Sequence, residues 1–513
     1  MNLDEIKQPF IKEFPGDFSG STAQRQTPKV LFAKTEINGF DNAELMAFNE
    51  KLSLEIGLGK IENEEDLNFL NATKLPENIQ TYATAYAGHQ FGNWAGQLGD
   101  GRAIFAGEFE NNGKKNEIQW KGAGATPYSR NADGRAVLRS TVREYLMSEA
   151  MFHLGVPTTR ALSFSLSGEN VLRDMMYDGN AAYEKGAVMV RTAESFLRFG
   201  HFELISAQSE LETLKKLTDS TIKNYYPEID SDNSKKYELF FQTVAERTAD
   251  LMIEWYRVGF VHGVMNTDNM SVLGLTIDYG PFSFIDEYDL NFTPNTTDLP
   301  GRRYAFGNQG KIAQWNLWQL ANALFPLIKD EKFLEKTLND FTEIFWQKHD
   351  EMMAKKFGFD SVLENDGTFF TEAQKIMEDL IIDYTLFFNQ LETYQSNSNF
   401  KSHFENVFYY PISSDQYLKL EAFLKNYEQR LKLNTISKKE SKTLMKKNNP
   451  KFVLRNYLLF ECIEELNVGK KDLFDKLIVA LENPYEEKFP EFSRKRPLLY
   501  NNQSGCSTLS CSS

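Results

Sequence analysis

The sequence predicts an α+β protein with a strand-rich lobe, a helical lobe and helical additions. The segment from Tyr82 to about Phe202 is rich in glycine and in short apolar alternations, which are typical of strands. From about residue 205 apolar residues recur at helical spacing, and after Gly310 the chain is predominantly helical. No internal repeat is evident along the 513 residues.

Four segments are expected along the chain. Residues 1–80 are mixed and polar, contain a helical-looking stretch at 42–58, and are interpreted as an N-terminal extension. The strand-rich lobe follows at 81–204 and the helical lobe at 205–345. A helical C-terminal extension with a cysteine-containing tail completes the chain at 346–513.

The strand-rich lobe is expected to contain a hairpin and one long helix. GRAIFAGEF and EIQWKG flank an Asn-Asn-Gly-Lys turn at 111–114, which is typical of a hairpin. Apolar residues then recur near every 3.6 positions over 138–154, and Gly155 and Pro157 end that helix. Strand-like ALSFSLS and GAVMVRTA come next.

The helical lobe is expected to begin with helices at 208–226 and 236–258, which lead into a loop carrying Asp and Asn. Four long helical segments follow, IAQWNLWQLANALFPLI, FLEKTLNDFTEIFWQKHDEMMAKKF, MEDLIIDYTLFFNQLETY and YLKLEAFLKNYEQRL. This order is that of a bilobal, protein-kinase-like fold with N- and C-terminal extensions.

Composition excludes several classes of protein. A hydrophobic content of 41% over 513 residues indicates a multi-lobed globular enzyme. The net charge of -15 argues against a protein that coats nucleic acid or anionic membrane. Because no leader-like h-region and no run of 18 apolar residues occurs, the simplest expectation is a soluble cytoplasmic protein.

Any catalytic metal is expected to have oxygen ligands. The three cysteines, Cys462, Cys506 and Cys511, are too few and too late in the chain for a disulfide framework or a cysteine-rich zinc site. The six histidines are dispersed. These observations point to Mg²⁺ or Mn²⁺.

The stretch HGVMNTDNMSVLGLTIDYG, at 262–280, resembles a phosphotransfer centre with one part changed. Protein kinases carry H-R-D-x-x-x-x-N followed by D-F-G, in which the first Asp handles the substrate hydroxyl and the Asn and second Asp hold metal. His262 and Asn269 are seven apart, as in that motif, but the position of the kinase base is Val264.

Asn269 and Asp278 lie nine apart across the strand-like MSVLGLTI, so a hairpin would bring an amide and a carboxylate to one metal. Asp268 immediately precedes Asn269 in a loop and offers a carboxylate close to that site. The alternative is that N-T-D-N is only good turn sequence. A turn, however, does not require a D-Y-G after the next strand.

A second group of candidates lies in the strand-rich lobe. Gly99 and Gly101, in GQLGDGRA, would let backbone N–H groups approach phosphate oxygens, with Arg102 as a phosphate or base contact. An ordinary glycine-rich turn would look similar. Lys121 shares a strand face with Gln119, where a kinase keeps its phosphate-binding lysine.

Glu144, in the first long helix, is expected to pair with Lys121; the alternative is a capping box with Thr141. Arg191 and Arg198 are seven apart, which places both on one side if the segment between them is helical. Two converging arginines would bind polyphosphate through bidentate hydrogen bonds. Two surface salt-bridge arginines are the alternative.

Several long motif strings, taken in order, resemble the selenoprotein O (YdiU) family over nearly the whole chain. They are YAGHQFG, GQLGDGRA, WKGAGATPYSRNADGRAVLRS, VRTAESFLRFGHFE, HGVMNTDNMSVLGLTIDYGPFSFID and the terminal Cys-Ser-Ser. The resemblance implies a pseudokinase-fold protein adenylyltransferase that binds ATP flipped relative to kinases. AMP then passes to a Ser, Thr or Tyr hydroxyl of a protein and pyrophosphate leaves; some members are described as transferring UMP.

The resemblance also implies roles for individual residues. Asp268 matches the family's base, Asn269 and Asp278 its metal ligands, and Glu144 the residue that orients Lys121. The residues expected around the nucleotide are Gly99, Gly101, Arg102, Lys121, Asp133, Gly134, Arg191, Arg198 and Asp278. The expected partners are ATP or UTP and protein substrates, with no nucleic acid or membrane.

One departure from the family concerns redox control. Members with such control pair a C-terminal cysteine or selenocysteine with a cysteine near the activation segment, but residues 278–310 contain none. Cys506 and Cys511 remain candidates, against the alternative of idle thiols in a tail. Two other functions compete with nucleotidyl transfer: a kinase-like phosphotransferase and a non-catalytic nucleotide-binding scaffold.

Overall fold

The chain is α+β, as predicted, and one large sheet dominates its N-terminal part. The computed structural model describes residues 1–396 and 398–510. The sheet has the order β1-β2-β4-β7-β8-β11-β10-β3, with β9 paired to β11, and is antiparallel except between β1 and β2. Its strands are β1 Gly16–Asp17, β2 Phe32–Lys34, β3 Glu44–Phe48, β4 Tyr82–Thr84, β7 Ala103–Asn111, β8 Lys114–Lys121, β9 Ala136–Val137, β10 Arg160–Arg173 and β11 Ala182–Ala193.

Two small two-stranded sheets lie outside this sheet. One is the hairpin of β5 (Ala87–Gln90) and β6 (Asn93–Gln97), and the other pairs β12 (Phe260–Val261) with β13 (Ser283–Phe284). Three short helices, α1 (Pro9–Glu13), α2 (Glu50–Glu55) and α3 (Glu64–Leu70), belong to the N-terminal part.

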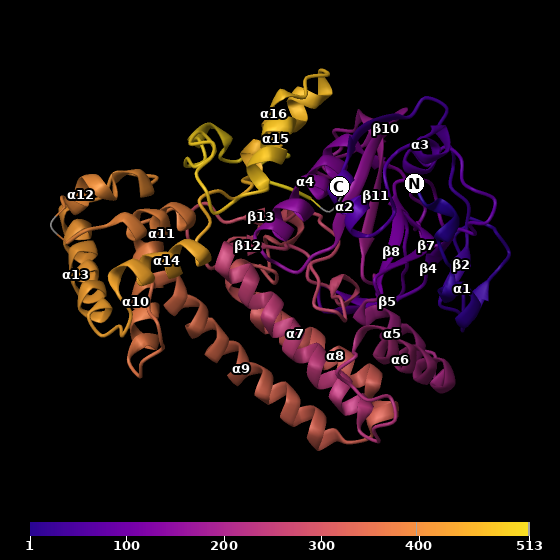
Figure 1. Cartoon of the computed structure of the whole chain (residues 1–513), viewed down its shortest axis with the longest axis horizontal. Helices are drawn as coiled ribbons and strands as arrows, with labels where there is room; N and C mark the ends of the chain where they lie inside the picture. The colour runs from indigo at the N-terminus through magenta and orange to yellow at the C-terminus, as the bar shows by residue number, and fades with distance from the viewer. Residues whose placement is uncertain (397, 511–513) are drawn as a thin grey trace.

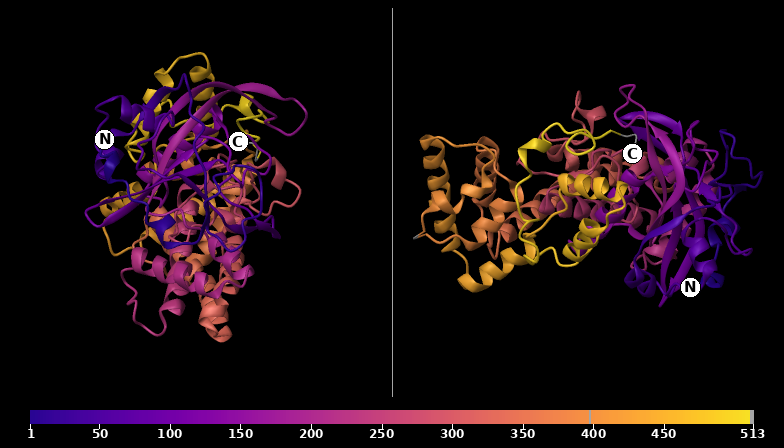
Figure 2. Two further views of the ribbon diagram at one scale, coloured as in Figure 1. Left: turned by 90° about the vertical axis from the view of Figure 1, so that its right-hand side faces the viewer. Right: turned by 90° about the horizontal axis from the view of Figure 1, so that it is seen from above.

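The rest of the chain is helical and elongated (Figure 1). Helices α7, α8 and α9 pack together, α9 leads toward α10–α14 at the end opposite the sheet, and α15 and α16 return to α4. The right-hand view of Figure 2 also shows the helices α10–α14 at the opposite end of the chain from the sheet. The helices are α4 Leu138–His153, α5 Phe199–Ala207, α6 Leu211–Tyr225, α7 Lys236–Val258, α8 Gln309–Ile328, α9 Glu331–Phe357, α10 Asp366–Asp379, α11 Tyr384–Thr393, α12 Phe400–His403, α13 Ser414–Leu431, α14 Lys438–Asn448, α15 Asn456–Asn467 and α16 Asp472–Leu481.

The two faces of the sheet pack against different helices. On one face Ile118 and Trp120 of β8 join the apolar cluster under α2 and α3, where the Trp120 indole donates to the Phe69 carbonyl at 2.8 Å. The opposite face is covered by α4, which packs on β10 and β11. The alternation of apolar and polar residues in β8 therefore turns Gln119 and Lys121 toward α4.

The predicted hairpin around 111–114 and the helix over 138–154 are confirmed as β7–β8 and α4. The prediction of a helix at 42–58 is wrong over the first half of that range. Residues Glu44–Phe48 form β3, because their backbone pairs with β10, and Asn49 then caps α2 by accepting the Leu52 N–H at 3.0 Å. Tertiary pairing thus overrides the local helical pattern.

The strand expected across MSVLGLTI is also wrong. The backbone there bonds to two other segments, with Val272 N–H donating to the Leu197 carbonyl at 3.2 Å and Thr276 N–H to the Pro157 carbonyl at 2.8 Å. The segment is therefore tied to the ends of α4 and β11 and forms no hairpin of its own. No helix within residues 1–396 and 398–510 combines the length and apolar character needed to span a bilayer.

Candidate active site

Two buried arginines converge on the carboxylate of Asp278. Arg191 Nη1 lies 2.9 Å from Oδ1, and Arg198 Nη1 donates to Oδ2. Burial by itself raises the pKa of Asp278, but Arg198, Arg191 and Lys121 outweigh burial and hold that pKa well below its usual value. Asp278 is therefore an anion, held in a left-handed backbone conformation with φ of +55°.

The arginines meet for a different reason from the one expected. The segment between them is not helical, since Arg191 lies in β11, which ends at Ala193, and Arg198 precedes the first turn of α5. Glu117 of β8 holds the intervening turn, where its Oε2 accepts the Phe196 N–H at 2.6 Å. His201 then accepts the Arg198 N–H through Nδ1 at 3.0 Å, and burial with Arg198 lowers its pKa to about 3, so it stays neutral.

Lys121 and Glu144 form the expected ion pair. The second carboxylate oxygen of Glu144 lies 2.9 Å from Arg191 Nη1, so Glu144 joins the lysine to the arginine cluster. Helix α4 begins at Leu138 and places Thr141 inside the helix, which makes the capping-box alternative wrong. Although burial raises the pKa of Glu144, Lys121 and Arg191 lower it overall.

Asp268 and Asn269 lie on the one-turn segment Thr267–Asn269, beside the arginine cluster. Arg198 Nη1 donates to the Asp268 carbonyl at 2.8 Å as well as to Asp278, so one guanidinium joins the two segments. Gln90 donates to Asp268 Oδ2 at 3.2 Å, whereas Oδ1 has no hydrogen-bond partner among the described residues. Burial raises the pKa of Asp268 to about 6, against the opposing effects of Gln90 and Arg198.

The same segment offers oxygen ligands for a divalent cation. Asn269 donates through Nδ2 to the Val264 carbonyl at 2.9 Å, which leaves its amide oxygen as an acceptor. Within the described residues no cluster of three His, Cys, Asp or Glu side chains could hold a metal. Mg²⁺ commonly takes only one or two carboxylates and completes its shell with water and phosphate oxygens. The pair of Asn269 and Asp278 fits that mode of binding.

The glycines of GQLGDGRA lie against the segment that carries the other predicted glycine. A Cβ at Gly99 would lie 2.5 Å from the Tyr128 ring, and one at Gly101 would lie 3.0 Å from the Tyr128 carbonyl. A Cβ at Gly134 would lie 2.1 Å from the Gly124 carbonyl. Close packing therefore requires glycine at Gly99 and Gly134, where φ is also positive, and leaves little room for a side chain at Gly101.

The remaining predicted residues differ in their placement. Arg102 is close enough to Glu144 and Asp278 for both carboxylates to oppose the lowering of its pKa by burial. Asp133 is exposed and forms hydrogen bonds of 2.8 and 2.7 Å with Arg173. Its contacts thus lie outside the cluster around Asp278. Cys506 is a buried free thiol whose pKa is raised to about 12 by burial and Asp286, and Cys511 lies outside the described residues.

Sequence reasoning missed several residues that hold the arginines. Gln119 accepts the Arg191 Nε–H at 2.7 Å, and Asp100 Oδ1 lies 3.8 Å from Arg198 Nη2. The Arg198 guanidinium lies 4.8 Å from the centre of the Tyr86 ring. Each of these residues lies beside or within a motif string quoted above. Membership of a string could therefore have pointed to them, although the chemistry of each residue alone did not.

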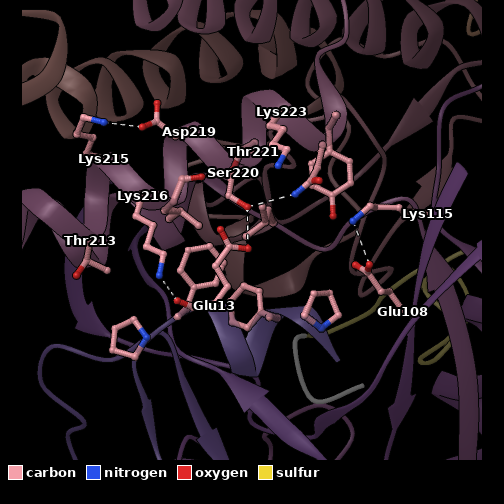
Figure 3. A pocket seen from close by; sticks show the side chains of 18 of the residues that line it. Glu13, Glu108, Lys115, Thr213, Lys215, Lys216, Asp219, Ser220, Thr221 and Lys223 are labelled. Atoms are coloured by element: carbon pink, nitrogen blue, oxygen red, sulfur yellow. Dashed lines mark hydrogen bonds and ion pairs between the residues drawn. The ribbon is translucent and has the colours of Figure 1, made fainter. Parts of the chain in front are cut away.

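A separate cavity of about 860 Å³ lies between α1, α6 and the strands β7 and β8 (Figure 3). None of the predicted site residues lines it. Four of its charged groups form ion pairs with one another, Lys115 with Glu108 at 3.0 Å and Lys215 with Asp219 at 2.7 Å. Glu117, which holds the turn before Arg198, is part of its lining.

Glu117 predicts a pH dependence of stability. Burial raises its pKa from 4.5 to about 8 in the folded chain. Between these values the folded chain keeps a proton that the unfolded chain has released, so rising pH favours unfolding until about pH 8. We expect Glu117→Gln, which cannot ionise, to remove a slope of up to about 1.4 kcal/mol per pH unit. Denaturant unfolding of both proteins across this range checks the result, and equal slopes would contradict it.

Comparisons with known proteins agree on one family. The family model described as protein adenylyltransferase SelO matches residues 19–482. A protein nucleotidyltransferase YdiU from Cytophaga hutchinsonii is 47% identical, with 100% of this chain and 99% of the relative aligned. Proteins of the same name from Flavobacterium johnsoniae and an Azoarcus species are 44% and 42% identical, over 99% and 98% of both chains.

Proposed function

The chain belongs to the protein adenylyltransferase SelO family and is a nucleotidyltransferase, and from this premise we propose that it transfers AMP from ATP to Ser, Thr or Tyr hydroxyls of proteins. Pyrophosphate is the leaving group, and UTP serves as an alternative donor. The observation that carries the proposal is the convergence of Arg191 and Arg198 on Asp278. Asp268 lies beside this cluster, and its Oδ1 accepts no hydrogen bond from a described residue.

The proposed architecture is that of a kinase-like pair of lobes. Residues 81–204 form the lobe that carries Lys121 and Glu144, and residues 205–345 form the lobe that carries Asp268, Asn269 and Asp278. The N-terminal extension and residues 346–513 are additions to this pair. The nucleotide then binds between segments that Arg198 already joins.

Lys121, Arg191 and Arg198 are proposed to neutralise the triphosphate. These three cations pair with Glu144 and Asp278. Phosphate oxygens compete for the same donors, because guanidinium groups bind phosphate through charge-assisted hydrogen bonds. An in-line attack on phosphorus needs positioning and charge neutralisation more than covalent help, and this set of donors supplies both.

Asn269 and Asp278 are proposed to hold Mg²⁺ or Mn²⁺. When bound there, the cation supplies further neutralisation of charge on the phosphates. Asp278 becomes free for this role when the two arginines shift from its carboxylate to the nucleotide.

Asp268 is proposed to receive the proton of the acceptor hydroxyl. Its Oδ1 carries no hydrogen bond from a described residue, and Gln90 fixes Oδ2 at 3.2 Å. A positioned carboxylate of this kind raises the rate by general base catalysis. A kinase would place its base at position 264, and this chain places a carboxylate four residues later.

Labelled ATP tests the proposed reaction. We expect protein acceptors to retain label from α-³²P-ATP and none from γ-³²P-ATP, since the bond to the α-phosphorus forms and pyrophosphate leaves. Gel autoradiography after denaturation measures the retained label. Label from the γ position alone would instead establish a phosphotransferase, and label from neither position a nucleotide-binding scaffold.

A further inference from the structure

One face of α8 carries large aromatic side chains exposed to solvent. Trp318 and Phe325 are 51% and 45% exposed, although both belong to a helix whose other side is buried. The helical repeat places the following residues on this face, which we call the α8 aromatic face: Lys311, Gln314, Trp315, Trp318, Asn322 and Phe325. The buried side of α8 packs on α5, α7 and α9.

Trp315 connects this face to the candidate active site. Its ring lies 5.5 Å from the His89 ring, and the Arg303 guanidinium lies 4.5 Å from its centre. The His89 N–H donates to Thr267 Oγ1 at 2.7 Å, one residue before Asp268. The α8 aromatic face is therefore connected through His89 to the Thr267–Asn269 segment, which carries Asp268.

The β5–β6 hairpin adds a further aromatic group on the same side of the site. Trp94 is 46% exposed, and its ring lies 4.9 Å from the His89 ring. The same hairpin carries Gln90, which contacts Asp268. A Cβ at Gly88 would lie 2.5 Å from Asp268 Oδ1, so the hairpin backbone passes directly beside that oxygen.

An acceptor protein has to approach this hairpin. Asp268 Oδ1 is buried under the hairpin backbone. The residues on either side of an acceptor hydroxyl that approaches Asp268 therefore lie over the hairpin and the start of α8. Exposed aromatic groups beside a functional site are typical of protein-binding surfaces, and tryptophan is a frequent anchor in them. The helices α10–α14 lie at the end of the chain opposite the sheet (Figure 1), and Trp318 and Phe325 remain exposed.

We propose that Trp318, Phe325 and Trp94 form a docking surface for the acceptor protein and bind an apolar side chain in the segment that carries the acceptor hydroxyl. The proposal rests on the proposed function and adds a substrate preference to it. Trp315 is held between His89 and Arg303, whereas Trp318 is free to contact a partner. The ten residues from Trp315 to Phe325 rise about 15 Å, which an extended peptide spans in about five residues.

Two synthetic peptides test the docking surface. Both carry one serine and a fluorescent label; one has phenylalanine about five residues away on each side, and the other has glutamine at those positions. We expect the wild-type protein to show a KM about tenfold lower for the phenylalanine peptide, because tenfold corresponds to about 1.4 kcal/mol and a buried aromatic anchor contributes that much to binding. Label from α-³²P-ATP measures transfer, and fluorescence anisotropy measures binding.

Trp318→Ala supplies the decisive comparison. We expect it to raise the KM and Kd of the phenylalanine peptide at least about fivefold, with kcat, the KM for ATP and the glutamine peptide unchanged. Leu418→Ala, which alters a residue 62% exposed on α13 at the far end of the chain, is the matched control and leaves all values unchanged.

The possible outcomes separate the docking surface from the proposed function. Equal KM values for the two peptides, or a phenylalanine peptide unaffected by Trp318→Ala and Phe325→Ala, would overturn the docking surface. Anisotropy that shows selective binding sensitive to Trp318→Ala, without label on either peptide, would support the surface and reject transfer to serine. Absence of both binding and label would reject the surface.

Discussion

Replacing Asp278 with asparagine is expected to lower the rate of nucleotidyl transfer at least about 10³-fold. The substitution removes the carboxylate proposed as a cation ligand and leaves Arg191 and Arg198 facing a neutral amide. Because a buried ion pair loses one partner, we also expect the free energy of unfolding to fall by about 3 kcal/mol or more. Transfer from α-³²P-ATP and denaturant unfolding measure the two effects.

The loss of activity must be separated from the loss of stability. Nucleotide binding without added metal provides that separation, since Lys121, Arg191 and Arg198 remain available for phosphate. We expect Asp278→Asn to bind ATP in calorimetry with EDTA present, yet to show no stimulation by Mg²⁺ or Mn²⁺. Asp289→Asn is the matched control, since the Asp289 carboxylate accepts the Asn291 N–H at 2.8 Å and an asparagine oxygen can replace it. A folded Asp278→Asn protein with wild-type transfer would refute the metal assignment.

Replacing Asp268 with asparagine is expected to lower kcat by about 10² to 10⁴-fold with little change in the Kd for ATP. The asparagine keeps the size of the side chain and an oxygen that accepts from Gln90. It cannot receive a proton from the acceptor hydroxyl, however. Steady-state transfer and equilibrium nucleotide binding together distinguish a lost base from a lost binding site.

Two further comparisons complete this experiment. Gln90→Ala removes the donor to Oδ2 and keeps the carboxylate, so we expect a loss of activity much smaller than that of Asp268→Asn. Thermal unfolding of both variants shows whether the fold is preserved. If Asp268→Asn transfers nucleotide as fast as the wild-type protein, Asp268 is not the base and the proton leaves by another path.

Periodicity in the sequence was sufficient to predict the elements whose hydrogen bonds are local, namely the β7–β8 hairpin and helix α4. The turn at 111–114 predicts β7 and β8, and alternation along β8 predicts that Lys121 and Trp120 face opposite sides of the sheet. Helical spacing predicts α4, and the likeness to the lysine–glutamate pair of kinases predicts the pair of Lys121 with Glu144. In these elements the hydrogen bonds and the apolar face both follow from a short stretch of chain.

Sequence patterns failed where backbone groups bond to distant segments. The stretch across MSVLGLTI alternates like a strand, but its N–H groups donate to residues near 157 and 197. The stretch at 42–58 has helical spacing, but half of it pairs with β10. Local propensity is a weak preference, and tertiary hydrogen bonds overrode it in both places.

The sequence by itself determined the family, the residue types of the candidate site and the strand and helix that hold Lys121 and Glu144. Only the tertiary structure decided that Asp278 is the common partner of Arg191 and Arg198, which are 87 and 80 residues away along the chain. The tertiary structure also gives Asp268 Oδ1 no hydrogen-bond partner among residues 1–396 and 398–510, and it places the aromatic face of α8 near the same loop. Such contacts depend on where β11, α5 and the 262–280 segment pack, because spacing along a chain fixes only the neighbours within one element.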